Sequence, residues 1–235
     1  MYAKYYKRLL DLVLSAVALI VFAPVLLLLS VVGLFAMKGN PFFTQLRPGT
    51  IDPKTGKERI FRLIKFRSMT CERDAQGNLL SDEIRLTNYG KFLRSTSLDE
   101  LPELINIFVG DMSIVGPRPQ LVRDMVFMTA EQRRRHIVRQ GLTGLAQING
   151  RNNISWDRKL AYDLQYIESV SFLSDIRILI GTVFKVFEQD GITEEGNATA
   201  EDLGDYLLRT QQISHEVYRV KMREAEELLK ETVNC

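Results

Sequence analysis

The longest apolar run in the chain lies near its N-terminus. From Leu12 to Met37 no residue is charged, and this stretch is longer than the roughly 20 residues that a helix needs to cross the hydrocarbon core of a bilayer. Pro24 stands in the middle of the run, where a proline removes one backbone hydrogen bond and predicts a bend. The pattern therefore predicts a membrane helix.

Basic residues flank this run on both sides. Lys4, Lys7 and Arg8 precede it, and a series of lysines and arginines follows between residues 38 and 67. The positive-inside rule then gives a spanning helix no clear orientation, whereas a helix that bends at Pro24 and returns to the same face satisfies both flanks. We predict a re-entrant membrane helix-hairpin in residues 1–38. A kinked spanning helix and a cleaved signal peptide are the alternatives.

The pattern then changes to short extended pieces. Residues 60–66 are rich in strand formers, and Asp52-Pro53 and Thr55-Gly56 are turn formers, which together predict a β-hairpin. The second piece carries Arg62, Lys65 and Arg67. Without a partner motif, these residues favour a solvated or lipid-facing strand edge.

A helical pattern returns at residue 98. Its apolar positions are Leu98, Leu101, Leu104, Ile105 and Phe108. Asp99 and Glu100 stand at the start of this pattern, and Ser97 with Glu100 matches a capping box. Pro102 fits better if Asp99 is the cap, because the proline then lies among the donors that have no partner. From pattern alone, helix capping is the favoured interpretation of the acid pair.

A stiff turn that carries an arginine follows this helix. Gly110 can end the helix, and Gly116 to Pro119 reads Gly-Pro-Arg-Pro, so the backbone of Arg118 is fixed by a proline on each side. A fixed guanidinium suits bidentate contact with phosphate oxygens. The carboxylate pair, this arginine and a membrane anchor together suggest magnesium-assisted phosphoryl chemistry beside a lipid.

Composition restricts the class of protein. The chain has 235 residues, 46% of them hydrophobic, and a net charge of +2, which indicates one compact domain rather than a disordered or repeat protein. Two cysteines and two histidines fit no metal-ligand spacing and argue against a zinc site. We expect no nucleic-acid partner.

Three long motifs resemble those of one known family. The sequences "LRSTSLDELPELINIFVGDMSIVGPRP", "FRLIKFRSM" and "GLTGLAQINGRN" are similar to the motifs of the bacterial sugar transferases called monotopic, or small, phosphoglycosyl transferases. The resemblance runs from the apolar segment to about Gly191. Two positions depart from the family pattern: Ala23 precedes Pro24 where serine is usual, and Gln140 stands where proline is common.

The resemblance implies an activity and its substrates. Such an enzyme moves a sugar 1-phosphate from a UDP-sugar to a polyprenyl phosphate, typically undecaprenyl phosphate, and releases UMP at the cytoplasmic face of the bacterial inner membrane. An N-acetylated or deoxyamino sugar is the first expectation, and a hexose is the second. Two other classes stay open: a non-catalytic membrane adaptor, and a membrane-bound phosphohydrolase that uses the same acids.

The resemblance also implies roles for individual residues. Asp99 would be the nucleophile and would lie at the Mg²⁺ site, and Glu100 would assist proton transfer or the metal. The basic positions that would contact phosphate or nucleotide are Lys65, Arg94, Arg118 and Arg151. Pro24 would bend the membrane helix.

The resulting expectation for the fold is an α+β, mostly helical protein. It would consist of the re-entrant membrane helix 1–38, a catalytic domain 39–191 with a short β-hairpin and amphipathic interfacial helices, and a polar helical extension 192–235. Residues 129–139 begin with a capping pattern and continue as a basic helix. Arg133, Arg134, Arg135 and Arg139 would face anionic phospholipids. In the extension, a weak stripe of Ile213, Val217, Val220 and Leu228 suggests a surface-packed tail, with a homodimer contact as one option.

Overall fold

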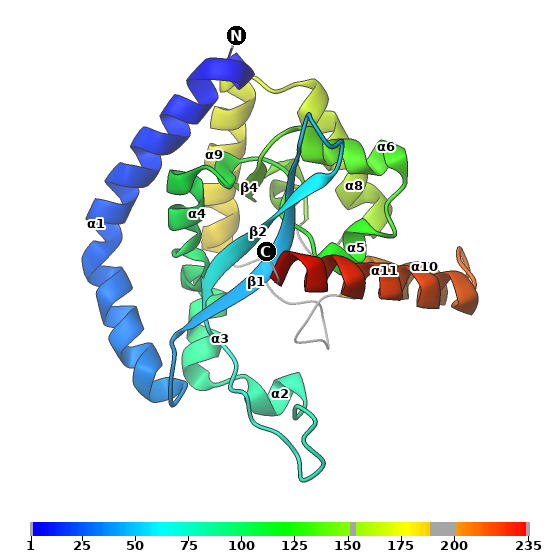
Figure 1. Cartoon of the computed structure of the whole chain (residues 1–235). Coiled ribbons are helices and arrows are strands. Elements are labelled where there is room, and N and C mark those ends of the chain that lie inside the picture. Colours follow the sequence, from blue (N-terminus) through cyan, green and yellow to red (C-terminus); the bar gives the residue numbers. More distant parts are fainter. Residues whose placement is uncertain (1, 151–153, 189–200, 234–235) are drawn as a thin grey trace.

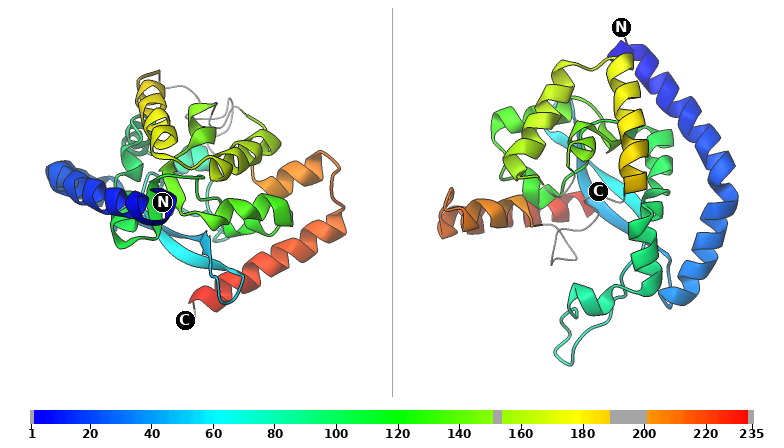
Figure 2. Two further views of the ribbon diagram at one scale, coloured as in Figure 1. Left: turned by 90° about the horizontal axis from the view of Figure 1, so that it is seen from above. Right: turned by 180° about the vertical axis from the view of Figure 1, so that it is seen from behind.

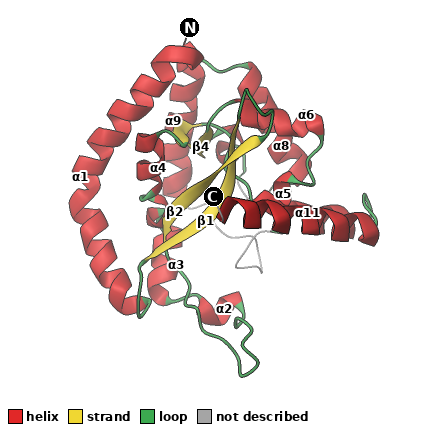
Figure 3. Cartoon of the chain, in the orientation of Figure 1, coloured by secondary structure: helices red, strands yellow, loops and turns green. Residues whose placement is uncertain are grey.

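The structure is a computed structural model that describes residues 2–150, 154–188 and 201–233. A π-helical turn, Tyr2–Tyr6, leads into the first long helix. The α-helices are α1 Lys7–Ala36, α2 Asp82–Arg85, α3 Asn88–Ser95, α4 Glu103–Val109, α5 Val122–Met125, α6 Ala130–Arg133, α7 Leu145–Ile148, α8 Trp156–Glu168, α9 Phe172–Glu188, α10 Leu203–Arg209 and α11 His215–Val233. Two 3₁₀ turns are Leu98–Glu100 and Arg134–Ile137, and the strands are β1 Phe42–Ile51, β2 Glu58–Phe66, β3 Met112–Val115 and β4 Gln140–Thr143. The expected α+β, mostly helical fold with a short β-hairpin is confirmed (Figure 3).

Helix α1 is the apolar segment predicted for the membrane. Among the described residues it is the one helix long and apolar enough to cross a bilayer, judged by length and composition. At 1.5 Å per residue its 30 residues extend about 45 Å. The helix continues through Pro24 as one element, and it follows a curved path along one side of the molecule (Figure 1).

Both ends of α1 are bonded to the rest of the protein. At its start, the guanidinium of Arg8 donates to the carbonyls of Ile107 (2.6 Å) and Phe108 (2.8 Å) at the end of α4. Near its end, the hydroxyl of Tyr89 on α3 donates to the carbonyl of Leu29 (2.8 Å). The face of α1 that points away from the domain is apolar and exposed, with Ile20, for example, 76% exposed.

The predicted β-hairpin is also confirmed. Strands β1 and β2 are antiparallel, with Phe43 opposite Lys65. The side chain of Asn106 on α4 joins the hairpin to the helix: its Oδ1 accepts from the backbone N of Ile64 (3.0 Å), and its Nδ2 donates to the carbonyl of Arg62 (2.8 Å). Phe61 and Leu63 pack on this side against Leu104 and Ile107, with Ala18 and Leu19 of α1 against the same cluster.

A second small sheet was not foreseen from the sequence. Strands β3 and β4 are parallel, with Met112 opposite Gln140. The backbone segments at Gly116 and Gly141 lie so close together that a Cβ on Gly141 would be 2.1 Å from the backbone N of Gly116. Only glycine fits at position 141, and Gln140, which stands where the family commonly has proline, is the first residue of β4.

The C-terminal helices lie on the side of the molecule opposite α1 (Figures 1 and 2). Ala225 is buried on α11, whereas Val217 and Val220 are exposed. Of the predicted stripe, Val217 and Val220 thus point to solvent, whereas Ile213 and Leu228 are half-buried; α11 packs against α5 and α10. Helix α9 buries Ile178 and exposes Ile180, Val183 and Phe184, so several of its apolar side chains point outward.

The Asn106 bridge gives a stability prediction. Replacing Asn106 by alanine removes both bonds to β2, and a buried polar group without a partner costs about 1–3 kcal/mol. We expect Asn106→Ala to lower the free energy of unfolding by about 2–4 kcal/mol in denaturant titrations in detergent. Asn78→Ala, in an exposed loop, is the control and should stay within about 0.5 kcal/mol of wild type; equal effects of the two variants would contradict the bridging role of Asn106.

Candidate active site

The acid pair lies on a 3₁₀ turn between α3 and α4 and caps neither helix. Ser97 has a left-handed backbone (φ 56°) and its side chain makes no capping hydrogen bond. Helix α4 begins only at Glu103, directly after Pro102, where a proline loses no backbone bond. The predicted capping box is therefore wrong, and so is Asp99 as the cap, which leaves both carboxylates available for other contacts.

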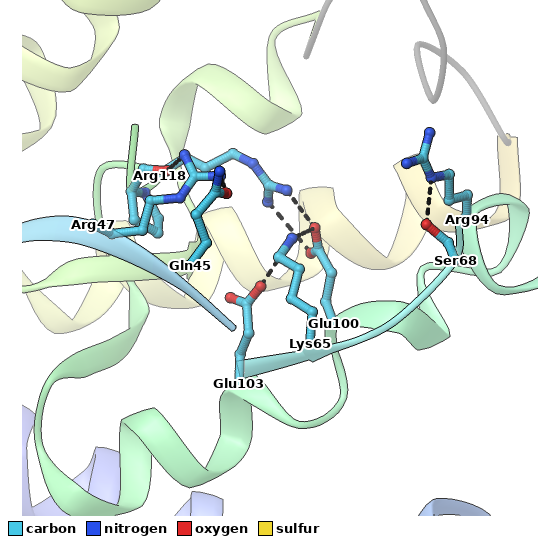
Figure 4. A network of polar contacts seen from close by, with 9 residues as sticks. Gln45, Arg47, Lys65, Ser68, Arg94, Glu100, Glu103 and Arg118 are labelled. Carbon is cyan, nitrogen blue, oxygen red and sulfur yellow. Dashed lines mark hydrogen bonds and ion pairs between the residues drawn. The ribbon is translucent and has the colours of Figure 1, made fainter. Parts of the chain in front are cut away.

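Lys65 is held between two carboxylates. Its Nζ lies 2.9 Å from Oε1 of Glu100 and 3.0 Å from Oε1 of Glu103 (Figure 4). Alternate residues of a strand share a face, so Lys65 points to the same side as buried Phe61 and Leu63. Its ammonium is thus an interior group, and the interpretation of Lys65 as a solvated or lipid-facing edge residue is wrong. Burial would lower the pKa of Lys65, but Glu100 and Glu103 outweigh burial and raise it.

Arg118 completes the network from the opposite side. Its Nη1 donates to Oε2 of Glu100 (3.3 Å), and its Nη2 contacts Oε1 of the same carboxylate. Burial alone would raise the pKa of Glu100, but Arg118 and Lys65 hold it well below its usual range. Glu100 is therefore ionised at neutral pH and paired with two cations. The side chain of Arg118 is 39% exposed, so its guanidinium can be reached from solvent.

Asp99 differs from Glu100 because no described residue forms an ion pair with its carboxylate. It forms no hydrogen bond or ion pair with another residue in the described part of the chain, although Lys65, Arg118 and Arg94 act on it electrostatically. Burial and the charge of Glu100 raise the pKa of Asp99, and the three cations only partly offset this effect. Among the described residues, Asp99 is the acid of this site whose carboxylate forms no ion pair.

Glu103 is a site residue that the sequence interpretation missed. Its side chain is 1% exposed, and burial raises its pKa although Lys65 lies beside it. The signal was present in the sequence, since an acid directly after a proline marks a helix start. That signal predicts only that a helix begins near Glu103. It does not indicate that the carboxylate would pair with Lys65 of β2.

The remaining predicted positions lie at different places. Arg94 on α3 donates from Nε to the hydroxyl of Ser68 (3.0 Å), apart from Glu100 in Figure 4, and interacts electrostatically with Asp99. Pro24 lies inside α1 and takes no part in the network. Arg151 lies outside the described residues. The structure thus brings together Lys65, Arg94, Asp99, Glu100 and Arg118.

The turn that carries Arg118 is held by its backbone carbonyls. Arg135 donates from Nη2 to the carbonyl of Arg118 (2.5 Å), and Arg47 donates from Nη1 to the carbonyl of Pro119 (3.1 Å). Arg135 is fully buried and pairs with Asp163 on α8 at 2.9 Å. The two prolines fix the backbone dihedrals, and the two arginines fix where the turn lies.

These contacts correct the interpretation of the basic helix. Arg133 pairs with Glu58, Arg135 pairs with Asp163, and Arg139 donates to the carbonyl of Gly110 (2.9 Å). Of the four arginines assigned to lipid headgroups, Arg134 pairs with an exposed acid, Glu131, and Arg139 bonds to a backbone carbonyl, so these two stay available to headgroups. Within the run "RRRH", Arg135 and His136 are interior, whereas Arg133 and Arg134 are partly exposed.

The donor set limits which metal the site can hold. The described residues contain no group of three or more His, Cys, Asp or Glu side chains that could bind a metal by themselves. Mg²⁺ commonly uses one or two carboxylates together with phosphate oxygens and water. The uncommitted oxygens of Asp99 fit that requirement, whereas those of Glu100 face Lys65 and Arg118.

Comparisons with known proteins are consistent with this chemistry. Residues 2–189 match the family model described as bacterial sugar transferase. The uncharacterized sugar transferase EpsL of Bacillus subtilis (strain 168) is 47% identical over 196 residues, which cover 83% of this chain and 94% of that protein. A UDP-glucose:undecaprenyl-phosphate glucose-1-phosphate transferase of Klebsiella pneumoniae is 40% identical over 197 residues, covering 77% of this chain and 40% of that protein. A protein of the same description from Caulobacter vibrioides is 35% identical, with 78% and 70% covered.

The arginine run supplies a matched pair of variants. Arg135→Gln leaves Asp163 buried without its partner, and breaking a buried ion pair costs about 3–5 kcal/mol. Arg134→Gln removes an exposed pair, and such pairs contribute about 0–1 kcal/mol. We expect a large loss of thermal stability for Arg135→Gln only. A larger loss of stability in Arg134→Gln would contradict the interior assignment.

Proposed function

Because this chain belongs to the bacterial sugar transferase family, we propose that it is a phosphoglycosyl transferase that moves a sugar 1-phosphate from a UDP-sugar to a polyprenyl phosphate and releases UMP. The relatives described as UDP-glucose:undecaprenyl-phosphate glucose-1-phosphate transferases support this reaction. They also favour a hexose over an N-acetylated sugar as the first substrate to test. The chain spans less than half of the Klebsiella protein, so its substrates are proposed for the matched segment.

The observation that carries this proposal is the carboxylate of Asp99, which forms no ion pair with the described residues although three cations act on it. A UDP-sugar brings two negatively charged phosphates, and a carboxylate can approach them only where positive charge offsets the repulsion. Lys65, Arg94 and Arg118 all act electrostatically on Asp99. Glu100 and Glu103 hold the ammonium of Lys65 in place, so the cation is positioned before the substrate arrives.

In the proposed reaction Asp99 is the nucleophile. An oxygen of Asp99 forms a bond to the phosphorus that bears the sugar, and the bond from that phosphorus to the bridging oxygen breaks, so that UMP leaves with the electron pair. An oxygen of the polyprenyl phosphate then attacks the phosphosugar-aspartate and restores the free carboxylate. Both steps exchange one P–O bond for another, and no oxidant or reductant is needed.

Glu100 has a different role in this proposal. Because its pKa is low, Glu100 is ionised and orients Arg118 and Lys65. It would accept a proton only if the phosphates of the substrate drew these two cations away. Mg²⁺ would be held by Asp99 together with phosphate oxygens and would stabilise the charge that develops there. Arg118 is exposed enough to turn from Glu100 to the phosphates.

We further propose that α1 enters the membrane and returns to the same face. Both of its ends are bonded to one domain, through Arg8 at the start and Leu29 near the end. Helices α4 and α9 expose apolar side chains beside it, among them Val109, Leu173 and Phe184, which suits burial at an interface. UDP-sugars are cytoplasmic, so this face would be the cytoplasmic face of the inner membrane.

Anionic phospholipids remain the proposed membrane partner, at a revised position. Arg8 and Arg139 both donate to backbone carbonyls at the end of α4, and burial together with the repulsion of Arg8 and Arg59 lowers the pKa of Arg139. Such arginines next to exposed Phe108 and Val109 suit a headgroup layer. A homodimer contact through Val217 and Val220 stays a prediction.

The catalytic proposal predicts a covalent adduct on one residue. With Mg²⁺ and UDP-glucose but no lipid, intact-protein mass spectrometry of the detergent-purified protein should show a gain of one hexose phosphate. Asp99→Asn should show no gain, and its UMP release with lipid should fall at least about a thousand-fold. Asp157→Asn, an exposed position on α8, is the control.

Other outcomes of this experiment support the alternatives. UMP that appears only with lipid and without an adduct would indicate direct transfer. Free sugar phosphate without an acceptor would indicate a phosphohydrolase, and lipid binding without UMP would indicate an adaptor. Full activity of Asp99→Asn would exclude Asp99 as the nucleophile.

The membrane proposal predicts that both ends of α1 lie on one side. Single cysteines would be placed at Tyr5 and at Lys38, both exposed, in a chain with Cys71→Ser and Cys235→Ser. A membrane-impermeant maleimide should label neither cysteine in intact cells and both after permeabilisation. Labelling of one position from outside would establish a spanning helix instead.

A further inference from the structure

The segment directly after the Arg118 turn depends on the C-terminal part of the chain. Helix α5 begins at Val122, and the backbone N of Leu121 donates to Oδ2 of Asp124 (3.0 Å). The other oxygen of this carboxylate, Oδ1, accepts from the backbone N of Leu203 (2.9 Å), a buried bond across 79 residues. Asp124 is 2% exposed, so one interior carboxylate joins the turn to the start of α10.

Packing reinforces this junction. Leu203 is buried with Met128, Trp156 and Leu160, and the indole of Trp156 donates to the carbonyl of Glu201 (3.0 Å). The ring of Phe127 lies against Gly204, and its centroid lies 5.6 Å from that of the tilted ring of Tyr218 on α11. Residues 201–233, which we name the C-terminal clasp, thus cover the helix that follows the turn.

Charge connects the clasp to the Arg118 turn. Arg47 donates to the carbonyl of Pro119, and burial and the repulsion of Arg118 lower its pKa to about 10. Asp124 and Asp202 oppose that repulsion, and Asp202 also pairs with Arg123. Asp202, one of the acids that offset the repulsion between Arg47 and Arg118, therefore belongs to the clasp.

We infer that the C-terminal clasp is a positioning element for Arg118, acting through the Leu203–Asp124–Leu121 junction. The family match ends at residue 189, so this element lies outside the matched segment. The inference rests on the proposed function only in assigning Arg118 to substrate phosphate. Asp124 and Leu203 are positioning residues in this account, because neither is part of the Lys65–Glu100–Arg118 network.

The junction can be tested by removing a single N–H. Leu203 is the first residue of α10, a position that tolerates proline, and Asp202 before it has an extended backbone (φ −73°, ψ 156°) that is compatible with a following proline. Leu203→Pro removes the donor to Asp124. Leu203→Ala keeps this donor and is the matched control, since both variants shorten the buried side chain.

Two readouts separate positioning from simple destabilisation. In the full-length protein in detergent, amide hydrogen exchange should be about ten-fold faster for a peptide covering residues 119–126 in Leu203→Pro than in Leu203→Ala. The KM for UDP-glucose should rise at least about five-fold in Leu203→Pro and stay within about two-fold of wild type in Leu203→Ala. A loss of folded protein lowers the apparent kcat and leaves KM unchanged, so KM reports the placement of Arg118.

The two readouts test different parts of the inference. Equal exchange in the two variants would overturn the junction, and equal KM values would overturn its role in positioning Arg118. If the wild type turns over no UDP-sugar, the proposed function fails by itself. The exchange comparison then still determines whether the clasp orders the turn, because it needs no substrate.

Discussion

The ion pairs of Lys65 with Glu100 and Glu103 are the constraint on which the site depends. They join β2 to the 3₁₀ turn and to α4, three elements that share no regular hydrogen-bond ladder. Arg118 adds the turn after β3 through the same carboxylate of Glu100. Because both glutamates pair with cations in this way, the structure distinguishes chemically similar acids: two hold cations in place, and Asp99 forms no ion pair with the residues that the structure describes.

Residues around this network hold the backbone segments that carry Lys65 and Arg118 in place. Asn106 fixes the strand that carries Lys65, and Arg135 and Arg47 fix the turn that carries Arg118. In each case the bond is made to backbone atoms and not to the reactive side chain. The side chain of Arg118 can therefore change partner while its backbone stays in place, as electrostatic stabilisation of a phosphoryl group requires.

The sequence predicted elements that depend on neighbouring residues. The apolar run of α1, the hairpin and the end of α4 at Gly110 were all predicted, because composition and turn residues determine them locally. The sequence interpretation failed where distant residues decide the outcome: Ser97 adopts a left-handed turn in place of the capping box, and Arg133 and Arg135 pair with acids that no local pattern identifies. The long motifs named Lys65, Arg118 and the acid pair as site candidates, and the structure brings these residues together. Glu103 and Asp124 were not named, since their partners come from other elements.

The attachment of α1 has a consequence for the order in which the protein is made. Lys7 pairs with Asp175 (2.5 Å), a residue synthesised 168 positions later. At about 5–20 residues per second, the ribosome needs roughly ten to thirty seconds to reach it. During that time the apolar helix has left the ribosome without the surface that will hold it. In the proposed membrane arrangement, α1 would enter the bilayer before Asp175 is made, and its pairing with the domain would follow.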